Sequence, residues 1–149
     1  MLAWRIAKKR YHPYDGHGAL LRGGRWNSPG REVVYASATF EGAFLEILAH
    51  SMRPRTLPGP HHAVRIEIVD EQVEELDSEG LPGWEERDSP AARDYGDRWL
   101  EEMRTPALVV PALPSRPIGR TVLINPRHRT AGAIEVSATF DVPWDERLF

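Results

Sequence analysis

The chain of 149 residues has 41% hydrophobic and 28% charged residues, which is typical of a globular domain with one hydrophobic core. Its formal net charge of −3 lacks the basic excess of nucleic-acid binders, and no apolar run is long enough for a transmembrane helix or a signal peptide. Cysteine is absent, which excludes disulfides and thiol catalysis. We therefore expect a cytoplasmic protein with one domain over residues 1–149.

The charge is unevenly distributed along the chain. Residues 1–60 hold nine Lys and Arg against four Asp and Glu, whereas residues 61–104 hold five against fourteen. A basic first part favours an anionic ligand, and an acidic middle part favours a basic partner or a solvated face. Ordinary surface charge explains the same distribution equally well.

The first thirty residues predict one strand followed by turns. The apolar segment Leu2–Ile6 predicts a strand. Four glycines make residues 16–24 conformationally permissive, so we expect a flexible loop there. Residues 27–30, Asn-Ser-Pro-Gly, predict a turn in which the glycine adopts a positive φ.

A strand and an amphipathic helix follow. The β-branched and aromatic residues 33–36 predict the strand. Apolar residues recur at helical spacing over residues 40–48, with Ser37 or Thr39 available as the N-cap. Glu46 lies at the flank of this apolar stripe, beside Leu45 and Ala49 rather than on a charged face.

The remaining elements are shorter. A loop is expected around Pro54, Pro58 and Pro60, and residues 70–88 are expected to be irregular with at most a short helix. A helix is expected from Ser89-Pro90, an N-cap followed by proline, and it should end before Pro106. Further strands are predicted over residues 64–68, 107–110, 121–124 and 133–136, and the C-terminal segment should be anchored by Trp144, Leu148 and Phe149. These elements predict an α+β domain with several short, mostly antiparallel strands and two principal helices.

Three familiar kinds of site are not supported. Gly16-His17-Gly18 follows no hydrophobic strand and lacks the third glycine of a dinucleotide fingerprint. His50, His61 and His62 do not have the spacing of metal ligands, so no metal site is predicted. No serine stands in a G-x-S-x-G elbow, which argues against a hydrolase triad.

Arg25, Tyr35 and Glu46 are the candidate site residues. Arg25 follows two glycines, and its guanidinium would bind phosphate oxygens in bidentate fashion, although a surface ion pair fits its position as well. Tyr35 ends a strand, where it is either a stacking platform for a heterocycle or a core aromatic. Glu46 is either functional or paired with a nearby arginine.

Taken in order, many short motifs in this chain resemble the RES-domain family, the toxin half of Res–Xre toxin–antitoxin pairs. The resemblance extends over nearly the whole chain and rests on WRI, GHGA, GGRWNSPG, VVYAS, LEILAH, YGDRWL, VLINPRH and DERLF. It implies an ADP-ribosyltransferase-like fold and a toxin that degrades NAD⁺ in its own cell, with NAD⁺ as the substrate and no prosthetic group.

The resemblance also implies which residues form the site. The family's arginine, tyrosine and glutamate correspond to Arg25, Tyr35 and Glu46, which would be catalytic. The other expected NAD⁺ contacts are Arg5, Gly24, Trp26, Asn27 and Ser115. The family often has a serine after Val-Pro, but here the run is Val110-Pro111-Ala112. Either that role is dispensable, or Ser115 takes it over.

These residues suit cleavage of the bond between nicotinamide and ribose. The leaving group already carries a positive charge, so one carboxylate, Glu46, suffices to stabilise an oxocarbenium-like transition state. Arg25 would hold the pyrophosphate or the nicotinamide-side ribose, Arg5 would be a second anion contact, and Tyr35 would stack on nicotinamide. The acceptor could be water, phosphate or a protein side chain.

Other functions and the partners remain to be distinguished. A module that binds NAD⁺ or a partner without turnover, and a purely structural interaction protein, are the alternatives. The resemblance implies an Xre-type helix-turn-helix antitoxin as partner, bound at the pocket mouth or at the acidic residues 70–88, and a homodimer within a larger complex. DNA binding would then belong to the antitoxin and not to this chain.

Overall fold

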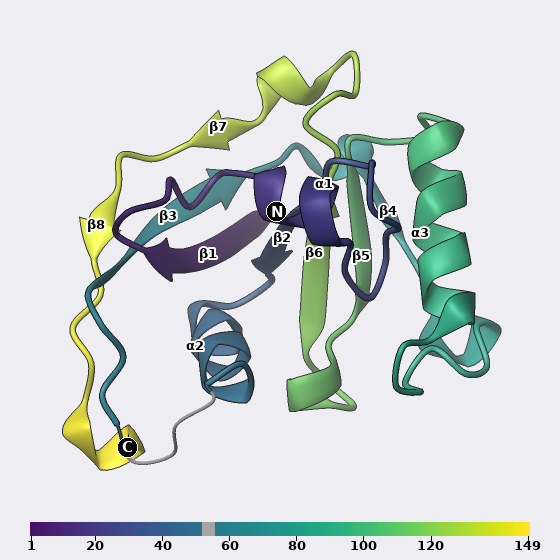
Figure 1. The fold of residues 1–149 in the computed structure, drawn as a ribbon. Coiled ribbons are helices and arrows are strands. Elements are labelled where there is room, and N and C mark those ends of the chain that lie inside the picture. The colour runs from purple at the N-terminus through teal and green to yellow at the C-terminus, as the bar shows by residue number, and fades with distance from the viewer. Residues whose placement is uncertain (52–55) are drawn as a thin grey trace.

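The computed structural model describes residues 1–51 and 56–149 (Figure 1). Of the prolines expected to form a loop, Pro54 lies outside the described residues. The strands are β1 (Leu2–Lys8), β2 (Val34–Ser37), β3 (His61–Glu67), β4 (Val73–Glu75), β5 (Ala107–Pro111), β6 (Arg120–Ile124), β7 (Glu135–Val136) and β8 (Phe140–Asp141). The α-helices are α1 (His17–Arg22), α2 (Phe40–Ala49) and α3 (Pro90–Glu101). None of the helices in the described ranges is long and apolar enough to cross a membrane.

The strands form a single sheet in the order β4-β5-β6-β2-β1-β3-β7, with β8 paired to β3. Every pairing is antiparallel except that of β4 with β5. β1 pairs with β3 through seven register pairs but with β2 through one, Trp4 with Ser37. Accordingly, β1 and β3 run across the view in Figure 1 while β5 and β6 run nearly perpendicular to them. The predicted α+β class with mostly antiparallel strands is confirmed.

Helix α2 begins where the sequence predicts. The Thr39 hydroxyl accepts a hydrogen bond from the Gly42 amide at 2.9 Å, so Thr39 rather than Ser37 is the N-cap. The apolar face of α2 packs against β1 through aromatic rings. The ring of Phe40 lies 5.6 Å from that of Trp4 and 5.0 Å from that of Phe44, with edge-to-face geometry in both pairs.

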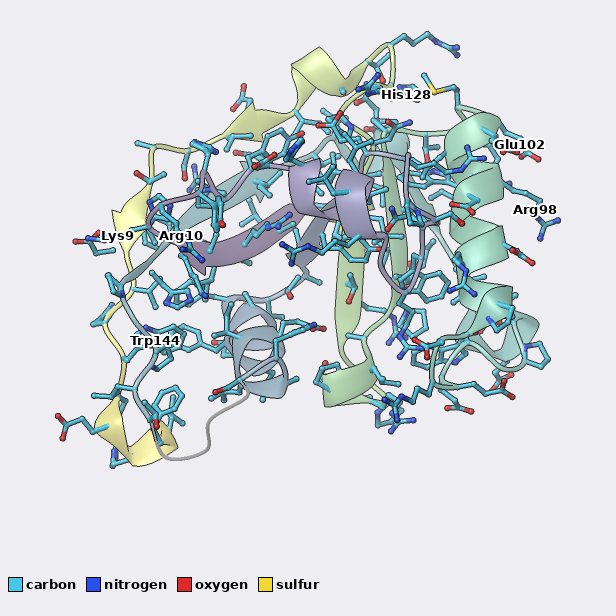
Figure 2. The ribbon with its side chains drawn as sticks, viewed as in Figure 1. Lys9, Arg10, Arg98, Glu102, His128 and Trp144 are labelled. Carbon is cyan, nitrogen blue, oxygen red and sulfur yellow. The ribbon has the colours of Figure 1, made fainter. Side chains whose placement is uncertain are left out.

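The C-terminal segment covers the same helix. Trp144 packs edge-to-face on Phe44 at 5.0 Å and on Phe149 at 5.7 Å, and Figure 2 shows it between the C-terminal segment and α2. Leu148 is 49% exposed. Trp144 and Phe149 therefore anchor the segment as expected, whereas Leu148 does not.

Helix α3 covers the β5 and β6 part of the sheet (Figure 1). Ser89 accepts a hydrogen bond from the Ala92 amide at 3.1 Å, and Pro90 occupies the first turn, as the sequence predicts. Trp99 is fully buried, and its indole N–H donates to the Thr105 hydroxyl at 3.0 Å. This side of the core also holds Trp26 and Trp84, whose rings stack with centroids 6.3 Å apart.

Helix α1 and strands β4 and β8 were not predicted. Helix α1 lies where a flexible loop was expected, because the glycines there bound a short helix. Gly23 ends the helix: it has φ of 73°, and its amide donates to the Ala19 carbonyl at 2.8 Å. Strand β4 falls in the acidic segment expected to be irregular. Strand β8 has two residues and forms by pairing with β3. Tertiary pairing, not local propensity, specifies both strands.

Candidate functional site

A cavity of about 680 Å³ lies where β1 and β2 part. It is bounded by these strands, by α1 and α2, by the turn at residues 23–26 and by the segment that follows β5. Six of the expected site residues line it: Arg5, Gly24, Arg25, Trp26, Tyr35 and Glu46. Asn27 and Ser115 do not line it.

The Arg25 guanidinium is oriented by backbone carbonyls. Its Nη1 group donates to the carbonyl oxygens of Trp84 at 2.9 Å and Glu86 at 2.7 Å. The Nε and Nη2 groups make no hydrogen bond to the described residues, and Arg25 forms no ion pair with them. A surface ion pair therefore does not explain Arg25, and its unbonded donors remain available to an anion.

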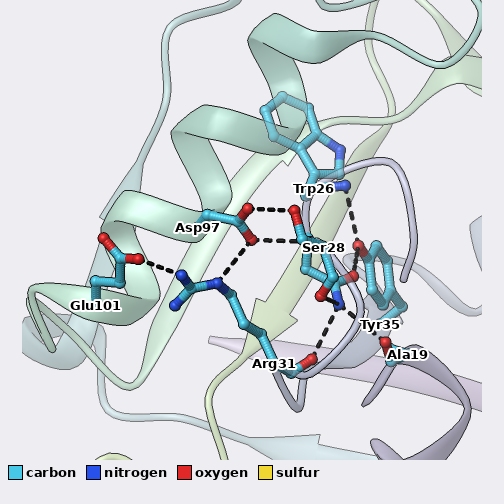
Figure 3. Close-up of polar contacts among 8 residues, drawn as sticks. Ala19, Trp26, Ser28, Arg31, Tyr35, Asp97 and Glu101 are labelled. Carbon is cyan, nitrogen blue, oxygen red and sulfur yellow. Dashed lines mark hydrogen bonds and ion pairs between the residues drawn. The ribbon is translucent and has the colours of Figure 1, made fainter. Parts of the chain in front are cut away.

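The Tyr35 hydroxyl supports the turn that carries Arg25. It accepts a hydrogen bond from the Trp26 amide at 3.0 Å and donates one to Asn27 Oδ1 at 2.7 Å (Figure 3). Burial raises the pKa of Tyr35, so the phenol keeps its proton. Gly24 permits this contact, because a Cβ there would come within 2.6 Å of the hydroxyl.

Asn27 has a structural place under this turn. Its side chain is fully buried, and Nδ2 donates to the carbonyl oxygens of Ala19, Ser28 and Arg31. Its polar groups are thus satisfied by the protein, which leaves none for a ligand. The residue holds α1 and the turn at 23–31 together rather than facing the cavity.

Asp97 of α3 ties the same turn to the helix (Figure 3). It accepts hydrogen bonds from the Ser28 amide at 2.8 Å and the Ser28 hydroxyl at 2.5 Å, and it lies 3.4 Å from Arg31 Nε. Arg31 also pairs with Glu101 on the next turn of α3. The sequence reasoning missed this link, although Gly96, Asp97 and Trp99 all stand in the YGDRWL motif.

Glu46 faces the cavity from α2, with its side chain 34% exposed. Burial raises its pKa, whereas the positive charges of His50 and Arg25 oppose the shift. One carboxylate oxygen lies 3.9 Å from His50 Nδ1, and the same nitrogen is 2.7 Å from the Glu46 carbonyl oxygen. Within the described residues no arginine forms an ion pair with Glu46, so that alternative is not supported.

Arg5 is a half-buried cation on β1 that lines the cavity. Its Nη1 atom is buried and bonds to none of the residues that the structure describes. Burial lowers the pKa of Arg5, and the negative charge of Asp15 opposes the shift. A buried charged donor without a partner is costly, so the position favours an anionic ligand group.

Ser115 is oriented away from the cavity. It ends the 3₁₀ helix Leu113–Ser115, of which Leu113 and Pro114 line the cavity. Its hydroxyl instead occupies the space beside Gly119, only 1.7 Å from where a Cβ on Gly119 would lie. Ala112, which takes the place of the family's serine, is buried. The described structure therefore places a hydroxyl group in the cavity neither at residue 112 nor at residue 115.

Two cavity-lining hydroxyls were not predicted as ligand contacts, those of Ser37 and Thr121. Ser37 follows Tyr35 by two residues, so strand alternation places both on one face of β2. This alternation was readable in VVYAS, but Ser37 was considered only as a helix cap and a hydrolase nucleophile. Thr121 enters the site through its pairing with Ser37, which no local pattern shows.

Fold and cavity together define an α+β protein with one mixed sheet and a cavity beside its second helix that Arg5, Arg25 and Glu46 line. Residues 2–145 match the RES domain, and the chain belongs to the RES-domain family. A protein named Toxin Res from Pseudomonas putida is 35% identical over 151 residues, which cover 100% of both chains. A Prs ADP-ribosylating toxin from a Sphingobium species is 35% identical, over 97% of this chain and 94% of its own.

The fold is also found in a solved structure. A chain of the M. tuberculosis MbcT–MbcA toxin–antitoxin complex superposes with a TM-score of 0.73, over 95% of this chain and 83% of that chain. The sequence identity is 16%, so this likeness concerns the fold alone. It agrees with the ADP-ribosyltransferase-like α+β architecture expected from the sequence.

Proposed function

We propose that this protein is the toxin of a toxin–antitoxin system and degrades NAD⁺ by cleaving the bond between nicotinamide and ribose. The observation that carries the proposal is that Arg25, Tyr35 and Glu46, from three separate elements, line one cavity. The toxin names of two relatives that cover nearly the whole chain support the biological role.

The cavity suits a dinucleotide in size and charge. Its volume of about 680 Å³ lies within the ordinary range of small-molecule sites, roughly 300–1,000 Å³. Arg25 has unbonded donors, and the buried Arg5 Nη1 has no partner among the described residues. Two such guanidinium groups match the pyrophosphate of NAD⁺, which accepts bidentate hydrogen bonds. The Tyr35 ring offers a face for nicotinamide, while its hydroxyl stays bonded to the turn.

Glu46 provides the charge that the reaction needs. As the ribose C1′–N bond breaks, its electron pair moves to the ring nitrogen, which loses its positive charge, so nicotinamide leaves without a proton. Positive charge then develops on the ribose, as in glycoside hydrolysis. The Glu46 carboxylate would stabilise that charge and accept a hydrogen bond from the ribose 2′-hydroxyl.

The acceptor distinguishes three products. Water yields ADP-ribose and a proton, phosphate yields ADP-ribose phosphate, and a side chain yields a modified protein. The printed name of the Sphingobium relative, an ADP-ribosylating toxin, favours transfer to a protein as the second candidate function. Labelled NAD⁺ separates them: label in small products indicates water or phosphate, and label retained on protein indicates transfer.

The test is release of nicotinamide from NAD⁺ by the purified protein, followed by chromatography. Wild type should release it, and Glu46→Ala should release it at least 100-fold more slowly, in line with the loss of one transition-state electrostatic contact. Glu41→Gln, on the same helix but outside the cavity lining, is the matched control. Undiminished release by Glu46→Ala would sink the catalytic assignment. NAD⁺ that raises the melting temperature yet remains intact would instead indicate a binding module.

We infer a protein antitoxin as the partner, by analogy with the complex that shares this fold. The Xre type of that antitoxin and a homodimer within the complex remain proposals. Coexpression with the adjacent gene, followed by copurification and light scattering, tests both. A monomer that copurifies with nothing would contradict them.

A further inference from the structure

Ser37 and Thr121 lie side by side on the cavity floor. They form a register pair of the antiparallel ladder between β2 and β6, so their side chains leave the same face of the sheet. Both line the cavity, although the two residues are only 5% and 8% exposed. Two neighbouring hydroxyl groups therefore face a space that is large enough for a ligand.

Neither hydroxyl is satisfied by the protein. Within residues 1–51 and 56–149, no hydrogen bond is formed by the Ser37 or the Thr121 hydroxyl. Neither hydroxyl oxygen is among the fully enclosed polar atoms without a partner in the described residues, so both remain accessible from the cavity. A Cβ on Gly42 would lie 3.1 Å from the Thr39 hydroxyl and 3.3 Å from the Ser37 Cβ, so this glycine lets the first turn of α2 pack closely against Ser37. The two hydroxyl groups are therefore available to form hydrogen bonds with a polar group of a ligand.

We propose that Ser37 and Thr121 form a neutral subsite that binds the carboxamide of the nicotinamide ring. The identity of the ligand rests on the proposed function. A pair of hydroxyls both donates and accepts hydrogen bonds, and a carboxamide offers one acceptor and two donors. The charged parts of NAD⁺ are matched by Arg5, Arg25 and Glu46, and Glu46 also takes the ribose hydroxyl. The carboxamide is the one polar substituent of the nicotinamide ring, and none of these three residues is assigned to it.

Strand geometry agrees with this assignment. Tyr35 and Ser37 are two residues apart on one face of β2, which corresponds to about 7 Å along the strand. The carboxamide of a nicotinamide ring stacked on Tyr35, together with a hydrogen bond of about 2.9 Å, would span roughly that distance toward Ser37 and its neighbour Thr121. A ring that carries a carboxylate instead would bring a second negative charge near Glu46 and offer no N–H donor.

The subsite therefore predicts selectivity for NAD⁺ over nicotinic acid adenine dinucleotide, which carries a carboxylate in place of the carboxamide. The variants are Ser37→Ala and Thr121→Val, the second being nearly isosteric. Each should lower kcat/KM for NAD⁺ about 5- to 10-fold, the usual effect of one lost hydrogen bond. The rate on the deamidated analogue should change little, so the ratio of the two rates should fall. Thr139→Val, exposed and remote from the cavity lining, is the matched control and should leave both rates unchanged.

The outcomes separate this proposal from the proposed function. Melting curves establish that each variant is folded, and calorimetric binding of NAD⁺ and of nicotinamide gives a readout that needs no turnover. If wild type binds NAD⁺ without cleaving it, the catalytic assignment is overturned, whereas weaker nicotinamide binding by the variants still supports the subsite. If wild type cleaves NAD⁺ but the variants keep its ratio of rates and its nicotinamide affinity, the subsite is overturned and the enzyme assignment stands.

Discussion

Gly96 of α3 lies directly against the backbone of Trp26: a Cβ on Gly96 would come within 1.7 Å of the Trp26 carbonyl oxygen. Trp26 is the neighbour of Arg25, and Asp97 bonds to Ser28 two residues further on. The helix thus touches the site turn with no side chain between them. The position of Arg25 therefore depends on how closely α3 approaches this turn.

The first prediction concerns this approach. Gly96→Ala should destabilise the protein by about 2–4 kcal/mol, because the new Cβ is fixed to the helix backbone and clashes with a backbone carbonyl, so only a shift of the helix relieves the clash. Nicotinamide release should fall as well, since the shift moves the turn that carries Arg25. Thermal unfolding and activity measure the two effects. Gly132→Ala is the control, because a Cβ there would meet nothing within 4 Å.

The second prediction separates the hydroxyl of Tyr35 from its ring. Tyr35→Phe leaves a stacking surface but removes the partner of the Trp26 amide and of Asn27 Oδ1. The expected loss is about 1–3 kcal/mol of stability, the cost of leaving buried polar groups unbonded. Tyr11→Phe, at a 52% exposed residue, should be neutral in the same denaturation experiment. A stability equal to wild type would contradict the role of the hydroxyl as a support for the turn.

The third prediction concerns Glu46 and pH. Burial raises the pKa of this carboxyl, and the proposed reaction requires the carboxylate, so activity should decline on acidification at a higher pH than for an exposed glutamate. A pH profile of kcat/KM checks this. If kcat/KM instead declines only at the pH where an ordinary exposed carboxylate titrates, Glu46 is not the titrating group.

The same shift has a consequence for stability. A carboxyl whose pKa is higher in the folded state destabilises the fold progressively as pH rises through the interval between its unfolded and folded pKa values. Glu46→Gln should therefore melt at a higher temperature than wild type at neutral pH while losing activity. Glu41→Gln should not gain stability, because Glu41 lies in the first turn of α2, where a negative charge is favourable.

The fourth prediction tests the shape of Arg25 against its charge. Arg25→Lys keeps a cation but cannot reproduce a planar group held by the Trp84 and Glu86 carbonyls while its other nitrogens face a ligand. Activity should fall by 10-fold or more at constant net charge, in the range of a lost bidentate contact. Arg22→Lys, at the end of α1, is the control. Full activity in Arg25→Lys would reduce Arg25 to a source of positive charge.

Local signals in the sequence predicted both principal helices with their caps, and six of the eight strands in the described residues. Thr39 and Ser89 cap as expected because N-cap chemistry depends on a few neighbouring residues. Strand β4 was not predictable in this way, since its acidic residues pair in parallel with a strand more than thirty positions away. For the same reason, periodicity correctly places Glu46 beside an apolar stripe but does not reveal that it faces Arg25 across a cavity.

The candidate site likewise combines residues that the sequence predicted with residues whose orientation only the structure shows. Arg25, Tyr35 and Glu46 were identified because an ordered set of motifs marked them, and the structure brings all three to the cavity. Asn27 stands in the same motif as Arg25, yet its amide nitrogen donates hydrogen bonds to three backbone carbonyls. A motif contains residues that support the fold as well as candidate ligand contacts. The two kinds are distinguished only by whether the side chain points into the protein or into the cavity.

Within the single sheet, β1 and β2 share only one register pair, whereas β1 and β3 share seven and β2 and β6 share four. Arg5 lies on the side of β1 and β3, and Tyr35 and Thr121 lie on the side of β2, β6 and β5. The cavity lies at this weakly paired junction. Its width therefore depends on the elements that connect the two sides, α2 and the turn that Asp97 of α3 holds, more than on strand pairing. A ligand that contacts both Arg5 and Tyr35 would add a further connection across the junction.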